Sequence, residues 1–181
     1  MDKIETKVVW VIDPVHSKIR FETRYLLITS ISGWFTEFEG TVITQSEEFN
    51  GSGINLIIYT NSIYTGNKER DTHLRSEDFF NTKRFPTMSF ISRSRVVKEK
   101  VIKVVGDLKI KDVNETIEFT ATHIGSAHDP LGNLKAGFEM STTINRKDFG
   151  ISWNQVFDQA GVLLSDEVKI YCDIQLLRVS Y

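Results

Sequence analysis

Residues 18–24 read Lys-Ile-Arg-Phe-Glu-Thr-Arg, so that charged side chains alternate strictly with Ile19, Phe21 and Thr23. A strand with this period presents one apolar and one polar face, which is typical of antiparallel sheets that cover a core on one side. The same alternation recurs along most of the chain, in residues 54–58, 88–90, 102–110, 117–122, 135–141 and 167–176. The sequence therefore predicts an all-β protein.

Short polar connections separate these runs. Residues 98–100 and 112–114 have the composition of hairpin turns, and residues 129–133 (Asp-Pro-Leu-Gly-Asn) form a strong turn signal. We expect a single domain over residues 1–181. Its predicted architecture is an extended antiparallel barrel of about eight strands, because closure removes exposed strand edges. A sandwich of two sheets is the alternative, since alternation alone does not separate the two architectures.

Three segments interrupt the alternation. Residues 66–80 are highly charged and predict one or two short helical turns, and residues 25–29 predict another helical turn between strands. Residues 146–162 are irregular and contain Gly150 and Gly161. We expect these segments to form connections at the ends of the barrel.

The composition is that of an ordinary globular protein. Of 181 residues, 40% are hydrophobic and 25% are charged, and the formal net charge of -2 gives no general attraction to nucleic acid. Cys172 is the only cysteine, which excludes an internal disulfide. No run approaches roughly 18 apolar residues, so no stable membrane insertion is expected. The first apolar run is cut by Asp13 and Pro14 and is too short for a secretion signal.

Two expectations about cellular context follow. The chain as given predicts a cytoplasmic protein, or a periplasmic one if a leader has been removed. Its polar outward faces also leave room for a homodimer formed through strand edges.

The inward positions indicate what the barrel would contain. They include small residues such as Gly106, Ala121 and Cys172, interleaved with aromatic ones. Two interpretations are open: the small residues leave a lumen, or they pack against larger neighbours. A lumen without inward charges would hold a long apolar molecule, with roughly 0.8 kcal/mol gained for each buried CH₂ group. The residues predicted to contact this ligand are Phe21, Phe35, Phe38, Ile58, Phe90, Leu108, Phe119, Ala136, Phe138, Met140, Trp153 and Phe157.

A series of short motifs runs along nearly the whole chain. The motifs are Trp10-Val11-Ile12-Asp13-Pro14-Val15-His16-Ser17, Gly33-Trp34-Phe35, Phe38-Glu39-Gly40, Ser62-Ile63-Tyr64-Thr65-Gly66-Asn67, Arg70-Asp71-Thr72-His73-Leu74-Arg75-Ser76, Asp78-Phe79-Phe80, Phe85-Pro86, Gly106-Asp107-Leu108-Lys109-Ile110 and Ile144-Asn145-Arg146-Lys147-Asp148-Phe149-Gly150. In content and order they resemble the YceI-like family of lipid- or polyisoprenoid-binding proteins. The chain departs from the family at Tyr64, where Asp is frequent, and at Tyr25, where many members have His.

The resemblance implies an extended, lipocalin-like barrel that holds a long apolar molecule in its lumen. The ligand would be a polyisoprenoid, a quinone tail or a fatty amide, and no cofactor besides such a bound lipid is implied. The resemblance implies no known catalytic activity. The apolar interior, without a catalytic constellation, favours a carrier, with a stress-related scaffold that has an incidental pocket as an alternative.

The cluster of Arg70, Asp71 and His73 is the strongest candidate for contact with a ligand head group. In a short helix, Arg70 and His73 share a face with Leu74. They would hydrogen-bond the head group at the barrel mouth, or, alternatively, cap the helical turn and tie it to the rim. Arg146 has the same two interpretations: it contacts the ligand, or it pairs with an acidic residue and pins its loop over the barrel end.

Residues suited to catalysis or metal binding are sparse. His16 and Ser17 lack a G-x-S-x-G motif or a nearby glycine, so they fit better as partners of backbone groups in the turn after Pro14. An enzyme acting on an apolar substrate, with His73 or His16 as acid or base, is the alternative function. His123 and His128 have no third ligand close in sequence, so no metal site is expected.

Overall fold

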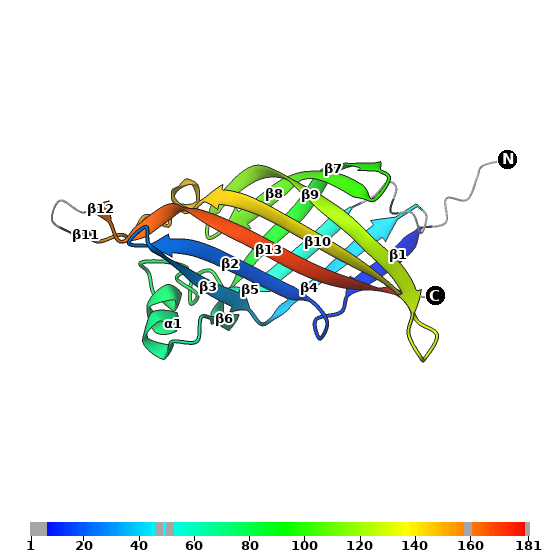
Figure 1. Ribbon diagram of the computed structural model, residues 1–181, viewed down its shortest axis with the longest axis horizontal. Helices are drawn as coiled ribbons and strands as arrows, with labels where there is room; N and C mark the ends of the chain where they lie inside the picture. The colour runs from blue at the N-terminus through cyan, green and yellow to red at the C-terminus, as the bar shows by residue number, and fades with distance from the viewer. Residues whose placement is uncertain (1–6, 46–48, 50–52, 158–160, 180–181) are drawn as a thin grey trace.

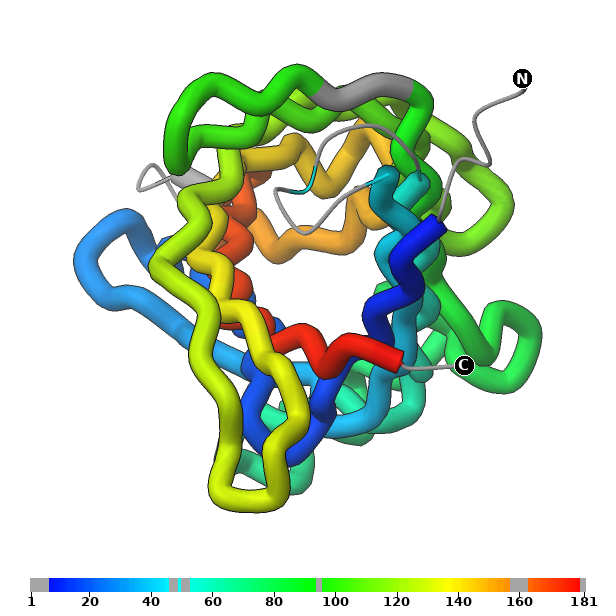
Figure 2. Tube along the Cα trace, turned by 90° about the vertical axis from the view of Figure 1, so that its right-hand side faces the viewer, coloured from blue at the N-terminus to red at the C-terminus, as the bar shows by residue number. Residues whose placement is uncertain are grey.

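The strands form one antiparallel sheet that closes into a barrel (Figure 1, Figure 2). The computed structural model describes residues 7–45, 49, 53–157 and 161–179. Its strands are β1 (Val8–Ile12), β2 (Lys18–Tyr25), β3 (Thr29–Phe35), β4 (Phe38–Thr44), β5 (Ile54–Tyr59), β6 (Ile63–Tyr64), β7 (Thr87–Lys98), β8 (Val101–Ile110), β9 (Val113–His128), β10 (Leu134–Asn145), β11 (Val156–Phe157), β12 (Gly161–Val162) and β13 (Leu164–Val179). The closed ring has 8 strands in the order β1-β4-β5-β7-β8-β9-β10-β13, and β13 pairs with β1. The predicted all-β barrel is confirmed, and the sandwich is excluded.

The connections contain one α-helix, α1 (Lys68–Arg75), and two 3-10 turns, η1 (Thr60–Ser62) and η2 (Arg146–Phe149). The helical turn predicted in residues 66–80 is therefore confirmed. The one predicted in residues 25–29 is wrong: Leu26 and Leu27 adopt left-handed φ angles of 51° and 61°, which form a tight turn instead. Within the described ranges, no helix is long and apolar enough to cross a bilayer.

The turns between strands lie close to where the sequence predicts them. The β7–β8 turn consists of Glu99 and Lys100, inside the predicted segment. The β8–β9 turn lies slightly earlier than predicted, at Lys111 and Asp112, because Val113 already pairs with Ile110 across the two strands. The irregular segment after η2 contains the short β11–β12 hairpin.

β13 runs along the whole barrel, and one of its edges pairs with a different strand in each half. Near its C-terminal end, residues 176–179 pair with β1, while residues 168–173 pair with β2. Its other edge pairs with β10 from Glu167 to Leu177. From β2 the sheet continues into β3 and β6, towards the end at which α1 lies (Figure 1). We call the part bounded by β1 the closed half and the part next to α1 the open half.

Aromatic side chains fill the closed half. The indole N–H of Trp10 donates to Thr44 Oγ1 at 3.2 Å, and the Trp10 ring lies 4.8 Å from that of Phe49. Phe49 is 2% exposed, and its ring lies 4.7 Å from Phe138. These rings come from β1, β10 and the segment between β4 and β5, so this connection packs against the two strands that flank β13.

A small inward residue makes room for an aromatic ring. A Cβ at Gly106 would lie 2.4 Å from Cζ of Phe90 and 2.5 Å from the carbonyl oxygen of Ile91. Phe90 therefore fills the space that a side chain at Gly106 would need. Of the two interpretations of the small inward residues, packing against a larger neighbour holds at this position.

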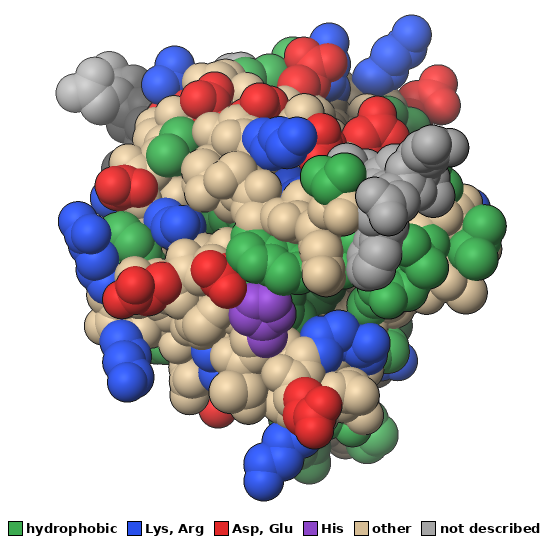
Figure 3. All heavy atoms as spheres, turned by 90° about the vertical axis from the view of Figure 1, so that its left-hand side faces the viewer, with side chains coloured by type: hydrophobic (Ala, Val, Ile, Leu, Met, Phe, Trp, Pro, Cys, Tyr) green, Lys and Arg blue, Asp and Glu red, His purple; other side chains and the backbone are tan. Residues whose placement is uncertain are grey.

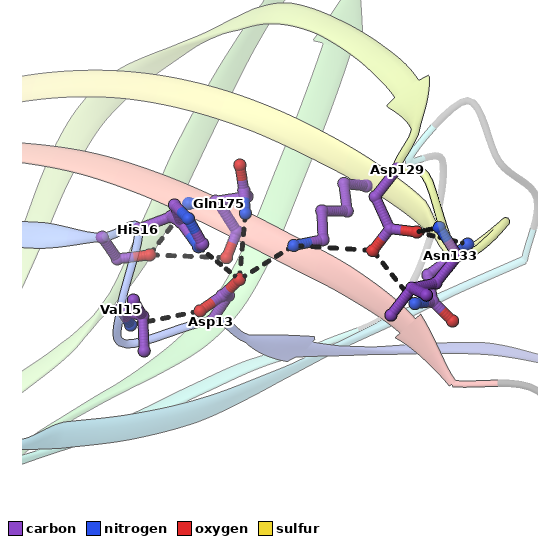
Figure 4. A network of polar contacts seen from close by, with 9 residues as sticks. Asp13, Val15, His16, Asp129, Asn133 and Gln175 are labelled. Carbon is purple, nitrogen blue, oxygen red and sulfur yellow. Dashed lines mark hydrogen bonds and ion pairs between the residues drawn. The ribbon is translucent and has the colours of Figure 1, made fainter.

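A polar network fixes the bend between β1 and β2 (Figure 4). Asp13 is at the bend, and Lys135, which binds it, also lies 3.8 Å from Asp129 in the β9–β10 turn. Burial by itself raises the pKa of Asp13, but its hydrogen-bond donors outweigh burial and lower the pKa to about 2. These donors are His16 Nδ1 at 2.8 Å, Gln175 Nε2 at 3.0 Å, the Val15 N–H at 3.1 Å and Lys135 Nζ at 3.2 Å.

Replacing Asp13 with Asn should destabilise the protein at neutral pH. The folded pKa of about 2 lies below the ordinary value of 3.8, so the carboxylate stabilises the fold above about pH 4. This contribution is lost as the pH falls through the folded pKa. A shift of this size corresponds to about 2 kcal/mol. Urea unfolding of the wild type and of Asp13→Asn at several pH values measures the difference.

The exposed Asp112 in the β8–β9 turn provides the matched control. Asp112→Asn should leave the free energy of unfolding nearly unchanged across the same pH range. Equal unfolding midpoints for the wild type and Asp13→Asn at neutral pH would contradict a stabilising role of the network.

Replacing Gly106 with Ala should destabilise the barrel, because the added methyl group would meet the Phe90 ring and a backbone carbonyl. Overpacking of this kind costs roughly 1–3 kcal/mol. Gly125→Ala is the control, since a Cβ there meets nothing within 4 Å. Thermal unfolding of both variants measures the effect, and an unchanged melting temperature for Gly106→Ala would show that the packing is loose.

Candidate functional site

A cavity of about 410 Å³ occupies the open half of the barrel. Its volume is within the range of roughly 300–1,000 Å³ that is typical of small-molecule sites. Most of its walls are hydrophobic side chains of β2, β3, β8 and β13, together with α1 and the segment after η2. Among the strand residues that line it are Ile19, Phe21, Leu108, Ile110, Val168 and Ile170.

The alternating pattern of β2 explains one wall of the cavity. Ile19, Phe21, Thr23 and Tyr25 all line it, because every second residue of a strand points to the same face. The opposite face of the strand carries Glu22 and other charged residues. The pattern that defines the fold therefore also supplies the wall of the site.

The helix α1 covers one side of the cavity. The side chain of Asn67 caps the helix by accepting the Arg70 N–H at 2.9 Å. Arg70, His73 and Leu74 all line the cavity, as their predicted common face requires. Leu74 adds apolar surface, and the two polar residues lie at the rim.

The side chains of Arg70 and Asp71 both bind Thr65, in the segment that leads into α1. Arg70 Nε donates to Thr65 Oγ1 at 2.8 Å, and Arg70 Nη2 donates to the Thr65 carbonyl at 3.0 Å. Asp71 is 4% exposed and accepts the Thr65 hydroxyl at 2.5 Å and the Thr65 N–H at 2.9 Å. Asp71 does not line the cavity. It ties the helix to the rim, which is the alternative interpretation.

His73 lies where the cavity reaches the surface. Its Nε2 is 2.8 Å from Asp78 Oδ2, and its ring packs edge-on against Phe79 at 5.0 Å and Trp153 at 4.7 Å. Figure 3 looks onto this end of the molecule and shows hydrophobic side chains next to a histidine. The ring contacts join α1 to the segment that follows η2.

Arg146 is buried at the end of the cavity, where its guanidinium binds backbone carbonyls of two segments; we call it the clamp of the segment after η2. Its Nε donates to the Ser165 carbonyl at 2.9 Å, and its Nη1 donates to the carbonyls of Ile151 and Trp153 at 2.9 and 2.7 Å. Burial lowers the pKa of the guanidinium, and Asp166, 3.4 Å from Nη2, acts in the opposite direction. Arg146 thus pins the segment after η2 over the barrel end, as one of its two interpretations predicts.

The sequence profile of the YceI-like domain matches residues 10–176. The chain belongs to the YceI-like family. It is 35% identical over 158 residues to the UPF0312 protein SAS2572 of Staphylococcus aureus strain MSSA476, and the match covers 87% of this chain and 90% of the relative.

Solved structures of similar shape have low sequence identity to this YceI-like protein. BcnA of Burkholderia cenocepacia has a TM-score of 0.78 and 21% identity, over 91% of this chain and 98% of that one. A polyisoprenoid binding domain from Saccharophagus degradans, described as implicated in plant cell wall breakdown, has a TM-score of 0.69 and 14% identity, over 94% and 98% of the two chains. At these identities the comparison shows that the fold is shared.

The structure separates the predicted ligand contacts of the YceI-like protein into two groups. Phe21, Phe35, Leu108 and Trp153 line the cavity. The side chain of Phe157 lies outside the described part of the structure. The remaining predicted contacts do not line this cavity and instead belong to the hydrophobic core or pack against it: Phe38, Ile58, Phe90, Phe119, Ala136, Phe138 and Met140.

This separation into two groups has a physical reason. Alternation tells which face of a strand points inward, but it does not tell what lies opposite across the barrel. Phe90 packs 5.3 Å from Phe119, and Phe138 packs against Phe49, so these inward rings contact one another. The cavity of the YceI-like barrel is lined by other inward residues, next to α1.

Several cavity residues were not among the predicted contacts. Val168 and Ile170 lie in an alternating run, so their inward direction was visible in the sequence. Tyr25 and Ile31 flank a turn whose geometry the sequence did not reveal. Leu163 lies between β12 and β13, directly after the irregular segment, where no period indicates a direction.

The other candidate reactive groups of this YceI-like protein are engaged elsewhere. Ser17 is buried, and its Oγ accepts the Gln175 N–H at 2.9 Å. The Nδ1 of His16 hydrogen-bonds the carboxylate of Asp13. His16 and Ser17 thus serve the turn after Pro14, as predicted, and do not line the cavity. Burial raises the pKa of the Cys172 thiol to about 12, which keeps it protonated. No three His, Cys, Asp or Glu side chains converge on a metal-sized site within the ranges that the structure describes.

Replacing Arg146 with Lys should loosen the segment that covers the cavity end. An ammonium group keeps the charge but lacks the planar fork of donors with which the guanidinium bonds three carbonyls at once. Loss of buried hydrogen bonds predicts a destabilisation of about 2 kcal/mol. Hydrogen–deuterium exchange of residues 146–155 should become faster.

Lys147→Gln is the control for this change. Lys147 pairs with the same Asp166 at 2.9 Å but is half exposed, so its removal should leave the exchange nearly unchanged. Equal exchange in Arg146→Lys and the wild type would mean that the clamp does not hold the segment.

Proposed function

We propose that this protein is a non-catalytic carrier that holds one long apolar molecule, such as a polyisoprenoid, a quinone tail or a fatty amide, in the cavity of its open half. The observation that carries the proposal is the cavity of about 410 Å³ with largely hydrophobic walls. The fold shared with a polyisoprenoid binding domain and the membership in the YceI-like family support it.

The energetics of such a site favour an apolar ligand. Each buried CH₂ group contributes roughly 0.8 kcal/mol, so a five-carbon isoprene unit contributes on the order of 4 kcal/mol before the cost of ordering. The described hydrogen bonds of Arg70 and Arg146 go to acceptors of the protein itself. A charged ligand would have to displace these bonds, whereas a hydrocarbon chain needs none of them.

The polar end of the ligand would lie at the rim formed by α1. His73 and Arg70 line the cavity there, and Tyr25 approaches from β2. The hydrocarbon part would extend from this rim towards Leu108 and Ile19. The packed closed half limits how far the chain can enter.

Neighbouring positions on β13 provide the test. Val168 lines the cavity, and Lys169 is exposed on the outer face. Val168→Trp should fill the cavity and weaken binding of the fluorescent probe 1-N-phenylnaphthylamine by at least about tenfold. Lys169→Trp adds the same ring outside and should leave binding unchanged. Equal binding by the wild type and Val168→Trp would refute this cavity as the ligand site.

An enzyme acting on an apolar substrate is the second candidate, favoured by the His73–Asp78 pair at the cavity rim. Incubation of the protein with farnesol, followed by extraction and mass spectrometry, separates the two functions. A carrier returns the farnesol unchanged. A product that disappears in His73→Ala would establish the enzyme instead.

A further inference from the structure

The end of the barrel next to the cavity exposes large apolar side chains. Leu26, Leu27 and Ile28, in the β2–β3 turn, are 41%, 64% and 77% exposed. Val156 in β11 is 78% exposed. Exposed apolar residues that occur singly need no explanation, but residues that gather at one site indicate an interaction surface.

Backbone contacts place these residues at one site. The Leu26 N–H donates to the carbonyl of Leu163 at 2.8 Å, and the Leu163 N–H donates to the carbonyl of Gln155, next to Val156, at 3.0 Å. The β2–β3 turn and the β11–β12 hairpin therefore lie side by side at the end of the barrel, as Figure 1 also shows. We call Leu26, Leu27, Ile28 and Val156 the apolar tip.

The apolar tip continues directly into the cavity wall. Tyr25 precedes Leu26 and pairs with Leu164 across β2 and β13, and both residues line the cavity. Leu163, whose carbonyl accepts the hydrogen bond from the Leu26 N–H, lines the cavity as well. An apolar surface thus runs from the outside of the molecule into its interior.

The backbone of this turn is unfavourable for leucine. Leu26 and Leu27 have φ angles of 51° and 61°, a region in which Asn and Gly occur far more readily. With 41% and 64% exposure, neither side chain recovers this cost by complete burial in the protein. A contact outside the protein would explain why leucine stands at these positions.

The apolar tip carries no charge of its own. Residues 25–29, 153–157 and 161–164 contain no Asp, Glu, Lys or Arg, and Asp158 is the single charged residue in residues 153–164. A surface of this kind fits the acyl region of a bilayer better than a charged partner. Amphipathic Tyr25 and Trp153 line the cavity behind it, where an interface would place them.

We propose that the apolar tip inserts into the surface of a lipid bilayer, so that an apolar ligand passes between the bilayer and the cavity without crossing water. This inference rests on the carrier function proposed above. The described exposed apolar residues at the opposite end include Leu131 in the β9–β10 turn and Val15 in the β1–β2 bend, 87% and 83% exposed, and they lie beside the charged groups of Asp13, Lys135 and Asp129. Docking therefore orients the barrel with α1 and the cavity towards the membrane.

Leu26→Asn/Leu27→Asn is the variant that tests the proposal. Asn tolerates the left-handed region, so the variant should unfold at the same or a higher temperature than the wild type. Its binding to phosphatidylcholine vesicles, measured by co-sedimentation, should fall at least about tenfold. Binding of the wild type should be nearly independent of salt, because no ion pairs are involved.

Leu131→Asn is the matched control, since it removes an exposed leucine at the other end of the barrel. It should bind vesicles as the wild type does. The proposal is overturned if the wild type does not bind the vesicles, if Leu26→Asn/Leu27→Asn binds equally well, or if Leu131→Asn loses as much binding. A dimer that dissociates in the double variant, without vesicle binding, would instead assign the apolar tip to a second copy of the chain.

Uptake of 1-N-phenylnaphthylamine from solution separates this inference from the carrier function. The double variant should bind the dissolved probe with unchanged affinity but take it up more slowly from preloaded vesicles. Wild-type protein that binds the probe but no vesicles overturns only the docking surface. Wild-type protein that binds vesicles but no probe overturns the carrier function.

Discussion

The pairing of β13 with β1 on one part of its edge and with β2 on the other decides the shape of the interior. Where β1 joins β13, the ring closes and Trp10 enters the lumen. Where β2 takes its place, the sheet turns away into β3 and β6 and leaves room for α1. Asp13 lies in the bend between β1 and β2, and the four hydrogen bonds that its carboxylate accepts hold this bend in place.

The two halves of the barrel have the same alternating strands but different interiors. In the closed half, aromatic rings contact one another, as Phe49 of the β4–β5 connection meets Phe138 of β10. In the open half, the walls are covered by α1 and by the segment that Arg146 clamps. Helical and irregular connections thus line the cavity together with the strands at this end.

The charged residues at the cavity rim act mainly on the protein itself. Arg70 and Asp71 both bind Thr65, and Arg146 binds backbone carbonyls. Their hydrogen bonds leave an interior whose chemistry is mostly hydrocarbon, which is the basis of the proposed carrier function. The same end of the molecule carries the apolar tip, so the cavity and the surface through which we expect it to be filled lie next to each other.

The sequence by itself determined the fold class, because strict alternation of apolar and polar residues is compatible only with strands that are buried on one face. It also determined that residues 66–80 contain a helical connection and that Phe21 and Leu108 point inward. Only the tertiary structure decided that Phe90 and Phe138 pack in the core while Val168 and Ile170 line a cavity. A period of two specifies a face of the sheet, whereas the level along the barrel axis and the side chains opposite depend on the register of strands far apart in the chain.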